Sequence, residues 1–595
     1  MWRYSAPLRE MQFVIDEWVG AARDWREIPA FASLDGDSVR DILAEAARFA
    51  EDVLAPANAT GDREGCHWNA GQVSTPTPFP AVYRQFCDAG WPTIACAEED
   101  GGQGLPQLLN AVFYEMCYAA NHAWAMYPGL AHGAYECIRN HGTDALKATY
   151  LPKVVSGEWL ATMCLSEPHA GSDLGLIKTQ AVEGPDGGYA LTGTKIFISG
   201  GEHDLTPNIV HLVLARLPYA PAGSRGISLF LVPKRLGADG AGPVNGVYCD
   251  GIERKMGING SATCVMRFDA AQGWLLGEPN RGLAAMFVMM NSARLYVGMQ
   301  GLGHAEAAYQ NAYRYAAERK QMRLTTPPPA GMATPTGPAV PILMHPGIRR
   351  SLMQMKVVIE AERAMAYWAA HLLDLAEHHP SETRRRESHD HVSLLTPIIK
   401  AMYTDNGFKL ASQALQIWGG YGYLEDYGVE QTVRDSRIAM IYEGTNDVQA
   451  IDLVVRKVVV DGGAKLKSLL VHLSAESVQA QECGHRVQRL AQRLHQLHAE
   501  IVQITDFVSE SAALDPEFPL KVGGDFLRLV GLGLMASFWC RAARVCEPRA
   551  TDDRFSQEKL SSAEYFFDSV LPETNYRLEL LRAGRCTLPW MDAPL

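Results

Sequence analysis

The segment 441–447, IYEGTND, places a carboxylic acid, Glu443, at the start of a turn of small residues. An apolar stretch precedes this turn, so we expect the acid at the edge of a core rather than on a solvated helix face. Partial burial raises the pKa of a carboxyl group towards the working pH, which suits a general base. Taken alone, the segment is more typical of a turn glutamate without chemistry, so its interpretation depends on the motifs that accompany it.

Two upstream segments accompany this turn. The first, MCLSEPHAGSD at 163–173, contains Gly171 and Ser172, small residues of the kind found where backbone amides approach a phosphate. The second, YALTGTKIFISG at 189–200, has the residue types of a strand. The alternative for the first segment is a polar loop between a helix and a strand, and for His169 we prefer that alternative.

Other candidate motifs fail on their context. The glycines of GMQGLG at 298–303 lie inside a helical pattern and follow no strand, so they do not predict a dinucleotide fingerprint. The histidines His485, His495 and His498 have no partners at metal-ligand spacing. The sequence therefore predicts no metal site.

The composition restricts the class of protein. A chain of 595 residues is too long for one core and suggests several domains. Its 47% hydrophobic and 20% charged residues are typical of a soluble globular protein, and its net charge of −13 argues against a general nucleic-acid binder. The twelve cysteines form no CxxC pair, which favours a reduced, cytoplasmic setting. Charged residues interrupt the N-terminal 20 residues, and the apolar stretch 529–540 is too short to span a bilayer, so we expect no membrane segment.

Periodicity indicates an α+β chain in four parts. Helical patterns extend from 37 to about 161, with apolar residues at three- and four-residue spacing in 39–56. Short β-rich segments follow at 189–200, 208–216, 226–234 and 262–270. Helical character resumes at 284–321, and a proline-rich loop at 325–346 precedes helical stretches at 347–379, 393–418, 477–508 and 526–545. We therefore predict an N-terminal helical domain at 1–160, an antiparallel β domain at 161–282, a helical domain at 283–460 and an additional helical domain at 461–595.

The motifs around residues 163, 189 and 441 together resemble the acyl-CoA dehydrogenase family in sequence, order and spacing. The resemblance extends from about the N-terminus to residue 457 and is strongest to the long bacterial branch that includes 3-methylmercaptopropionyl-CoA dehydrogenases. It implies an N-terminal helical domain, a middle antiparallel β-barrel, a catalytic domain like a four-helix bundle, and an extra C-terminal helical domain.

The resemblance implies FAD-dependent α,β-dehydrogenation of an acyl-CoA thioester to a trans-2-enoyl-CoA, with Glu443 as the base. The backbone N–H of Glu443 and a flavin ribityl hydroxyl would polarise the thioester oxygen. The substrate-binding residues that it implies are Ser172, Asn291, Arg294 and Gly444.

The same resemblance implies a set of FAD-binding residues. Phe197 stands where many family members carry tryptophan, and Arg319 stands where family members reach the FAD of an adjacent subunit, which favours a homodimer. We leave Asp447 out, because an acid near a phosphate would repel it. The implied set is Met163, Leu165, Ser166, Gly171, Ser172, Phe197, Ile198, Ser199, Arg319, Gln416, Gly419, Gly420, Thr445 and Asn446.

The resemblance also implies an electron-transfer flavoprotein as the electron acceptor, with no nucleic-acid or membrane partner. Two alternatives stay open: an acyl-CoA oxidase that returns electrons to oxygen, and a DNA-associated flavoprotein of the alkylation-response type. The acyl group is open as well, since methylthiopropanoyl-CoA and a medium- or long-chain acyl-CoA both agree with the sequence.

Overall fold

The fold is described by a computed structural model that covers residues 2–184, 187–327 and 337–584. Contacts between its elements divide the chain into two compact units. The first unit comprises Met1–Arg9, Ala22–Ala312 and Gly407–Glu443, and the second comprises Glu10–Ala21, Tyr313–Asn406 and Gly444–Leu595. The division into four domains stays a prediction from the sequence.

The N-terminal region is helical, as its periodicity predicts. Helix α3 begins after Asp35, whose carboxylate caps the helix by accepting a hydrogen bond from the backbone N–H of Ser38. Helix α6 is buried from Leu108 to its end and is kinked at Asn121, where φ is −161° and ψ is 88°. The helices are α1 (Leu8–Phe13), α2 (Ala21–Trp25), α3 (Gly36–Arg48), α4 (Asn58–Glu64), α5 (Phe79–Asp88), α6 (Gln107–Ala125), α7 (Ala131–His141) and α8 (Asp144–Val155).

The β-rich region forms a closed barrel. The strands pair in the order β6-β4-β5-β9-β7, and β7 pairs with β6 again, which closes the ring. The predicted antiparallel arrangement is confirmed for most pairs, but β3 runs parallel to β6 and β4 meets β6 in a parallel bridge. The strands are β1 (His67–Asn69), β2 (Gln72–Ser74), β3 (Leu160–Cys164), β4 (Gln180–Glu183), β5 (Tyr189–Ser199), β6 (Ile209–Arg216), β7 (Ile227–Pro233), β8 (Val247–Ile252) and β9 (Thr263–Leu276).

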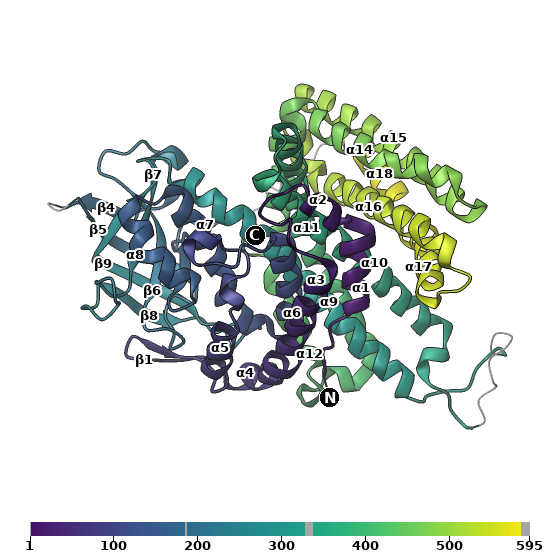
Figure 1. Cartoon of the computed structure of the whole chain (residues 1–595), viewed down its shortest axis with the longest axis horizontal. Coiled ribbons are helices and arrows are strands. Elements are labelled where there is room, and N and C mark those ends of the chain that lie inside the picture. Colours follow the sequence, from purple (N-terminus) through teal and green to yellow (C-terminus); the bar gives the residue numbers. More distant parts are fainter. Residues whose placement is uncertain (1, 185–186, 328–336, 585–595) are drawn as a thin grey trace, which may run out of the picture. The chain divides into compact units, whose positions relative to one another are not determined.

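Helices α7 and α8 cover one part of the barrel (Figure 1). Ile138 of α7 and Leu151 of α8 belong to one apolar cluster with Leu212 of β6 and Leu229 of β7. Because helices cover these strands on the outside and the barrel interior covers them on the other face, β6 and β7 are buried almost throughout.

Long helices make up the rest of the chain. Helix α16 packs against α10, α14, α15, α17 and α18. Its apolar residues lie on all sides, and a helix of that kind is normally enclosed by others. The helices are α9 (Gly282–Glu318), α10 (Pro346–His378), α11 (Glu382–Trp418), α12 (Val429–Ser436), α13 (Asn446–Ile451), α14 (Ala464–Gln479), α15 (His485–Leu514), α16 (Phe518–Cys546), α17 (Arg554–Tyr565) and α18 (Glu573–Ala583).

One helical stretch of the described residues, Phe518–Arg549, has the length and hydropathy of a membrane span. However, 83% of its apolar window is buried inside the protein, as in the core helix of a helical bundle.

A buried lysine on α17 ties distant parts of the second unit together. Lys559 is 3% exposed, donates to Glu10 and lies 2.8 Å from Oε2 of Glu360. Its ammonium also lies over the ring of Trp539. This cluster links the N-terminal segment to α10, α16 and α17.

The sequence predicts a proline-rich loop after α9 and helical glycines within 298–303. The predicted proline-rich loop at 325–346 includes residues 328–336, which lie outside the described residues. Pro341, within this loop, forms an isolated β-bridge with Lys320, which precedes the loop. The glycines of 298–303 lie inside α9, as expected; a Cβ on Gly303 would meet the backbone nitrogen of Ala119 at 2.7 Å, so this glycine allows α9 to approach α6.

Candidate active site

Glu443 lies in a strained turn immediately before α13. It is half-buried and has a φ of 56°, a left-handed conformation that is uncommon for residues other than glycine. Gly444 follows with a φ of 83°, and Thr445 then caps α13 by accepting a hydrogen bond of 3.4 Å from the backbone N–H of Val448. The turn therefore fixes the direction in which the carboxylate leaves the backbone.

A buried polar network holds Tyr442, the residue before Glu443. The Tyr442 hydroxyl donates to Oε1 of Gln300 and lies 3.2 Å from Nε2 of His122, while Nδ1 of His122 lies 2.9 Å from Nε2 of His304. One proton assignment satisfies these contacts: His304 donates to His122, and His122 donates to Tyr442. Burial lowers the pKa of His122 well below its ordinary value and that of His304 to about 4, so both rings are neutral.

A second network, in the second unit, holds the residues after Glu443. Nζ of Lys400 donates to the carbonyl of Gly444 at 2.6 Å and to Oδ1 of Asn446 at 3.0 Å. Nδ2 of Asn446 donates to Oδ1 of Asp405 at 2.7 Å and to Oγ1 of Thr404 at 3.1 Å. The Asn446 side chain, which the resemblance assigns to FAD, is thus engaged with α11.

The loop that follows β3 is fixed by a buried ion pair. The Lys195 ammonium lies 2.9 Å from Oε1 of Glu167 and also donates to the carbonyl of Leu165 at 3.0 Å. The Glu167 carboxylate accepts hydrogen bonds from the backbone N–H groups of Lys178 and Thr179. Burial opposes ionisation of Glu167, but the Lys195 charge and these hydrogen bonds outweigh it and hold the pKa of this carboxyl below its usual value.

Strand β5 brings the second motif against this loop. The backbone N–H of Ile196 donates to the carbonyl of Ser166 at 2.9 Å. The strand then bulges between Lys195 and Ile198, and Phe197 has a φ of 61°. As a result Phe197 is 62% exposed, whereas Ile198 is 2% exposed.

The structure places the residues of the first motif in two environments. Met163 lies on β3 and is 8% exposed. Gly171 and Ser172 are exposed, and a Cβ on Gly171 would meet no atom within 4 Å. The apolar surface at Phe197 on β5 and the open space at Gly171, on the loop that Lys195 fixes, fit a large planar cofactor with a pyrophosphate.

The other predicted residues lie on separate elements. Arg294 is 7% exposed on α9, with its guanidinium 5.9 Å from the centre of the Phe287 ring. Asn291 also lies on α9, and its side chain is outside the described part of the structure. Gln416 is exposed at the end of α11, and Gly419 and Gly420 follow it with open space at each Cβ position.

Arg319 is half-buried directly after α9, and its carbonyl accepts the backbone N–H of Ile342. Arg319, Gly444, Thr445 and Asn446 belong to the second unit, and the other predicted site residues belong to the first.

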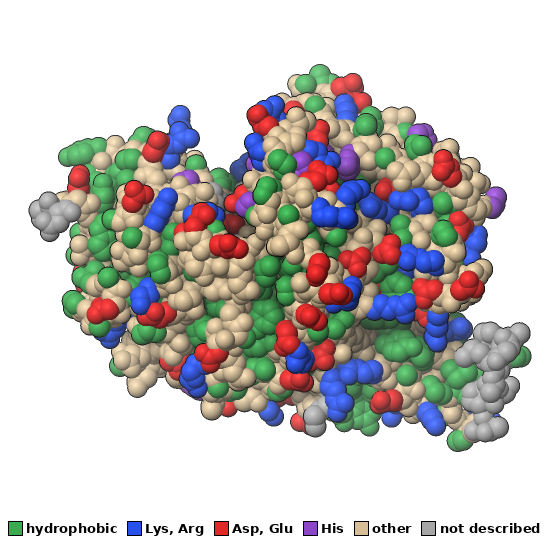
Figure 2. All heavy atoms as spheres, in the orientation of Figure 1, with side chains coloured by type: hydrophobic (Ala, Val, Ile, Leu, Met, Phe, Trp, Pro, Cys, Tyr) green, Lys and Arg blue, Asp and Glu red, His purple; other side chains and the backbone are tan. Residues whose placement is uncertain are grey.

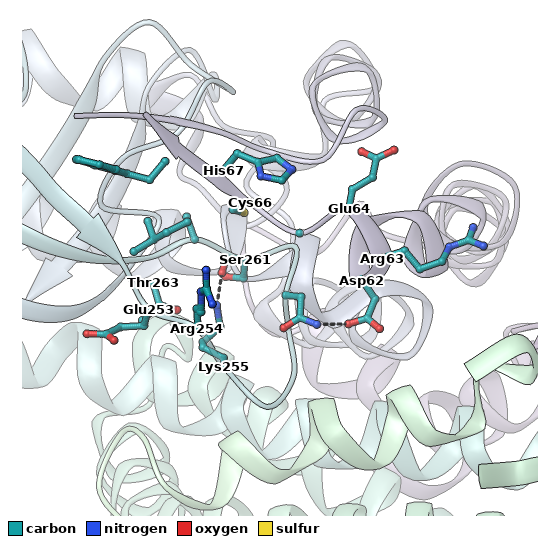
Figure 3. Close-up of a pocket in the computed structure, with 15 residues that line it drawn as sticks. Asp62, Arg63, Glu64, Cys66, His67, Glu253, Arg254, Lys255, Ser261 and Thr263 are labelled. Carbon is teal, nitrogen blue, oxygen red and sulfur yellow. Dashed lines mark hydrogen bonds between the residues drawn. The ribbon is translucent and has the colours of Figure 1, made fainter. Parts of the chain in front are cut away.

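A polar pocket of about 510 Å³ lies elsewhere in the first unit (Figure 3). Its lining includes Cys66 and His67 from the α4–β1 region and Lys255 from the segment after β8, and Lys255 donates to the carbonyl of Ser261. None of the predicted flavin or substrate residues lines it. Over the described residues there is also no cluster of histidine, cysteine and acidic side chains that could hold a metal ion.

Three of the residues that shape these sites were not singled out from the sequence. Glu167 and Lys195 lie inside the quoted motifs, and strand alternation places Lys195 on the same face as the buried Leu191, which is a detectable signal. Lys400 lies in an apolar stretch of α11, where no pattern distinguishes the side that meets the turn.

Four family models match consecutive parts of the chain. The acyl-CoA dehydrogenase N-terminal domain matches residues 37–158 and the middle domain matches 162–271. The acyl-CoA dehydrogenase C-terminal domain matches 333–458, and a domain described as acetyl-CoA dehydrogenase C-terminal like matches 470–592.

Two relatives match over nearly the full length. The chain is 40% identical to the 3-methylmercaptopropionyl-CoA dehydrogenase of Ruegeria pomeroyi over 96% of each protein. It is 33% identical to the broad-specificity linear acyl-CoA dehydrogenase FadE5 of Mycobacterium tuberculosis, again over 96% of each.

Solved structures share the fold. The acyl-CoA dehydrogenase of Bacillus anthracis, complexed with FAD, superposes with a TM-score of 0.75 at 20% identity, covering 95% of this chain and 91% of that one. The butyryl-CoA dehydrogenase of Megasphaera elsdenii superposes with a TM-score of 0.57 at 27% identity, covering 70% of this chain and 96% of that one.

Proposed function

Because the chain belongs to the acyl-CoA dehydrogenase family of FAD-dependent oxidoreductases, we propose that Glu443 is the base that removes the α-proton of an acyl-CoA thioester. The observation that carries this proposal is the fixed turn. Glu443 is half-buried with a left-handed backbone, between Tyr442 and Gly444, and a buried side chain bonds each of these neighbours. A base must be held in this way to meet a weakly acidic C–H bond.

Oxidation of a Cα–Cβ single bond removes a proton and a hydride. Bound FAD supplies the hydride acceptor, which no amino-acid side chain provides. Glu443 takes the α-proton onto its carboxylate, and trans-2-enoyl-CoA is the product. The Glu443 backbone N–H donates to the thioester carbonyl and acidifies the α-C–H.

We assign the flavin ring to the region where Phe197 projects from β5 and where Leu165 and Ser166 lie on the loop that Lys195 fixes. Gly171 and Ser172 offer open space and backbone amides to the pyrophosphate. Gln416, Gly419, Gly420 and Arg319 would complete the cofactor site, and Arg319 would do so in a homodimer. Ser172, Asn291, Arg294 and Gly444 are the proposed contacts to the acyl-CoA.

The acyl group is proposed from the relatives. The relative with 40% identity is a 3-methylmercaptopropionyl-CoA dehydrogenase, and the relative with 33% identity acts on linear acyl-CoAs of broad range. We therefore propose methylthiopropanoyl-CoA first and a medium- or long-chain acyl-CoA second. An electron-transfer flavoprotein is the proposed electron acceptor, and an acyl-CoA oxidase stays the enzymatic alternative.

A DNA-associated role would need a basic surface on the C-terminal helices. The arginines there are paired with acids: Arg486 with Glu564, Arg489 with Asp568, and Arg544 with Glu476. Figure 2 shows basic and acidic side chains mixed on the visible face. These pairs disfavour phosphate binding and support the enzymatic proposal.

A cytoplasmic location is part of the proposal. All cysteines among the described residues are free, and most of them are buried. Free, buried thiols fit a reducing compartment.

The test is an anaerobic titration of the purified yellow protein with acyl-CoAs from methylthiopropanoyl to palmitoyl, followed by flavin absorbance. Bleaching by a subset of thioesters, absent in Glu443→Gln, is the expected result and ranks the acyl groups. If every thioester leaves the bound flavin oxidised, the dehydrogenase proposal is wrong for these substrates.

A further inference from the structure

We propose that Lys400 is a positioning residue that fixes the turn carrying Glu443; this inference rests on the proposed role of Glu443 as the base. Lys400 lies on α11 and is 0% exposed. Its Nζ donates at 2.6 Å to the carbonyl of Gly444, the residue that follows Glu443 in the chain. This contact therefore acts on the backbone of the turn.

The surroundings of Lys400 make a purely packing role a poor explanation. Leu395, Ile398 and Ile399 on the same stretch of α11 are 0% exposed, so an apolar side chain would fit this region. Burying an ammonium is unfavourable unless hydrogen bonds compensate the lost hydration. Two of its hydrogen bonds go to acceptors within three residues of Glu443, the carbonyl of Gly444 and Oδ1 of Asn446.

Asn446 adds further hydrogen bonds between α11 and the turn. Its Nδ2 donates to the carbonyl of Ala401 at 3.1 Å and to Oδ1 of Asp405 at 2.7 Å, while its Oδ1 accepts from Lys400. Asn446 is the first residue of α13, so these bonds fix the start of that helix on α11. Lys400 then bridges the fixed residue to the carbonyl of Gly444.

The turn needs these hydrogen bonds because its backbone is strained. Glu443 and Gly444 have φ values of 56° and 83°. Glycine adopts this conformation freely, but a residue with a Cβ is disfavoured there. If the hydrogen bonds of Lys400 and Asn446 are removed, the Glu443 backbone can relax to a right-handed conformation. This change redirects the Glu443 carboxylate.

The first test measures the turn directly and does not depend on activity. Amide hydrogen exchange is compared for peptides that cover 441–450 in the holoenzyme, in Lys400→Met and in Lys559→Met. Lys559 is the matched control, since it is a buried lysine of the second unit that contacts Glu10 and Glu360. Faster exchange in 441–450 for Lys400→Met alone is expected. Equal exchange in wild type and Lys400→Met overturns the inference.

The second test measures the rate of flavin reduction by a saturating acyl-CoA in anaerobic stopped flow. Displacement of a catalytic group by about 1 Å can cost on the order of 100-fold in rate, so Lys400→Met should lose about 10- to 100-fold in kcat with a smaller change in KM. A rate equal to that of wild type, at equal FAD content, overturns the inference. If Lys400→Met does not fold, Asn446→Ala removes the other side-chain hydrogen bonds between the turn and α11. We expect the same loss of rate for this variant.

The two proposals fail in different ways. If no acyl-CoA reduces the wild-type flavin, the proposed function fails, and hydrogen exchange still decides whether Lys400 fixes the turn. If Glu443→Gln abolishes reduction while Lys400→Met keeps both the wild-type rate and the wild-type exchange, the base is retained and only the positioning role is lost.

Discussion

The Lys195 ammonium lies 2.9 Å from Oε1 of Glu167, and the two side chains are 0% and 3% exposed. The pair connects β5 to the loop after β3, since Lys195 also donates to the carbonyl of Leu165. These two segments carry most of the residues that we assign to the flavin ring. The pair is therefore a structural link between the two motifs that we propose to bind the cofactor.

We expect Lys195→Met to destabilise the protein by about 3–5 kcal/mol, because it leaves the Glu167 carboxylate buried without its charged partner. The variant should also lose FAD on gel filtration, as the loop is released. Thermal unfolding and the ratio of flavin to protein measure the two effects. Lys153→Met, which removes an exposed pair with Glu158, is the control and should change stability by less than about 1 kcal/mol. Equal behaviour of the two variants would contradict a linking role for Lys195.

Glu443→Gln should retain FAD and lower the rate of flavin reduction by at least about 100-fold, the lower end of what a general base contributes. The amide has nearly the same shape as the acid but cannot accept the α-proton. Asp447→Asn is the matched control: it neutralises an exposed acid in the same segment, and its rate should stay close to wild type. A normal rate in Glu443→Gln would remove Glu443 from the mechanism.

Variants of Phe197 test whether the side chain at the β5 bulge contacts the flavin. Its φ of 61° and its 62% exposure are both unfavourable in the protein alone. Phe197→Gly should be more stable than Phe197→Ala by about 1 kcal/mol, since glycine relieves the left-handed strain. Both variants should bind FAD about fivefold more weakly, as expected when a contact worth about 1 kcal/mol is lost.

Phe197→Trp, which restores the residue that many family members carry, should bind FAD at least as tightly as wild type. Isothermal titration of the apoprotein with FAD gives these affinities. Unchanged affinity in Phe197→Gly and Phe197→Ala would show that the exposed ring does not contact the flavin.

Much of the fold follows from the periodicity of the sequence. The features that were not predicted have a common cause. Alternation and helical spacing locate the strands and helices, but they carry no information on which strands pair. The parallel contact of β3 with β6 was therefore not predicted. The family resemblance supplied the closed barrel, which a list of strands does not determine.

Some residues of the candidate site could be predicted from the sequence, and others could not. Glu443 and Phe197 stand in motifs that the resemblance identifies by position. His122 and Lys400, in contrast, are polar residues in helical stretches that are apolar on every side, so no periodic pattern shows what they face. Their partners, Tyr442 and Gly444, are distant in sequence, and only the folded chain brings these pairs together.

A buried glutamate on α10 should make stability depend on pH. Glu362 is 0% exposed; Nδ2 of Asn406 donates to its Oε1, and its other carboxylate oxygen has no hydrogen-bond partner among the described residues. Burial raises its pKa from 4.5 to about 8, although the Asn406 hydrogen bond and the Arg528 charge oppose the increase.

Between these two pKa values the folded state keeps a proton on Glu362 that the unfolded state releases. Its contribution to stability is therefore complete below about pH 4.5 and is lost as the pH rises through about 8. Glu362→Gln removes this titration, so its Tm should decrease less than that of wild type between pH 5.5 and pH 8.5, by about 2–4 °C. Glu377→Gln changes an exposed glutamate on the same helix and should follow the wild-type curve. Parallel curves for wild type and Glu362→Gln would mean that Glu362 is ionised in the folded protein throughout this range.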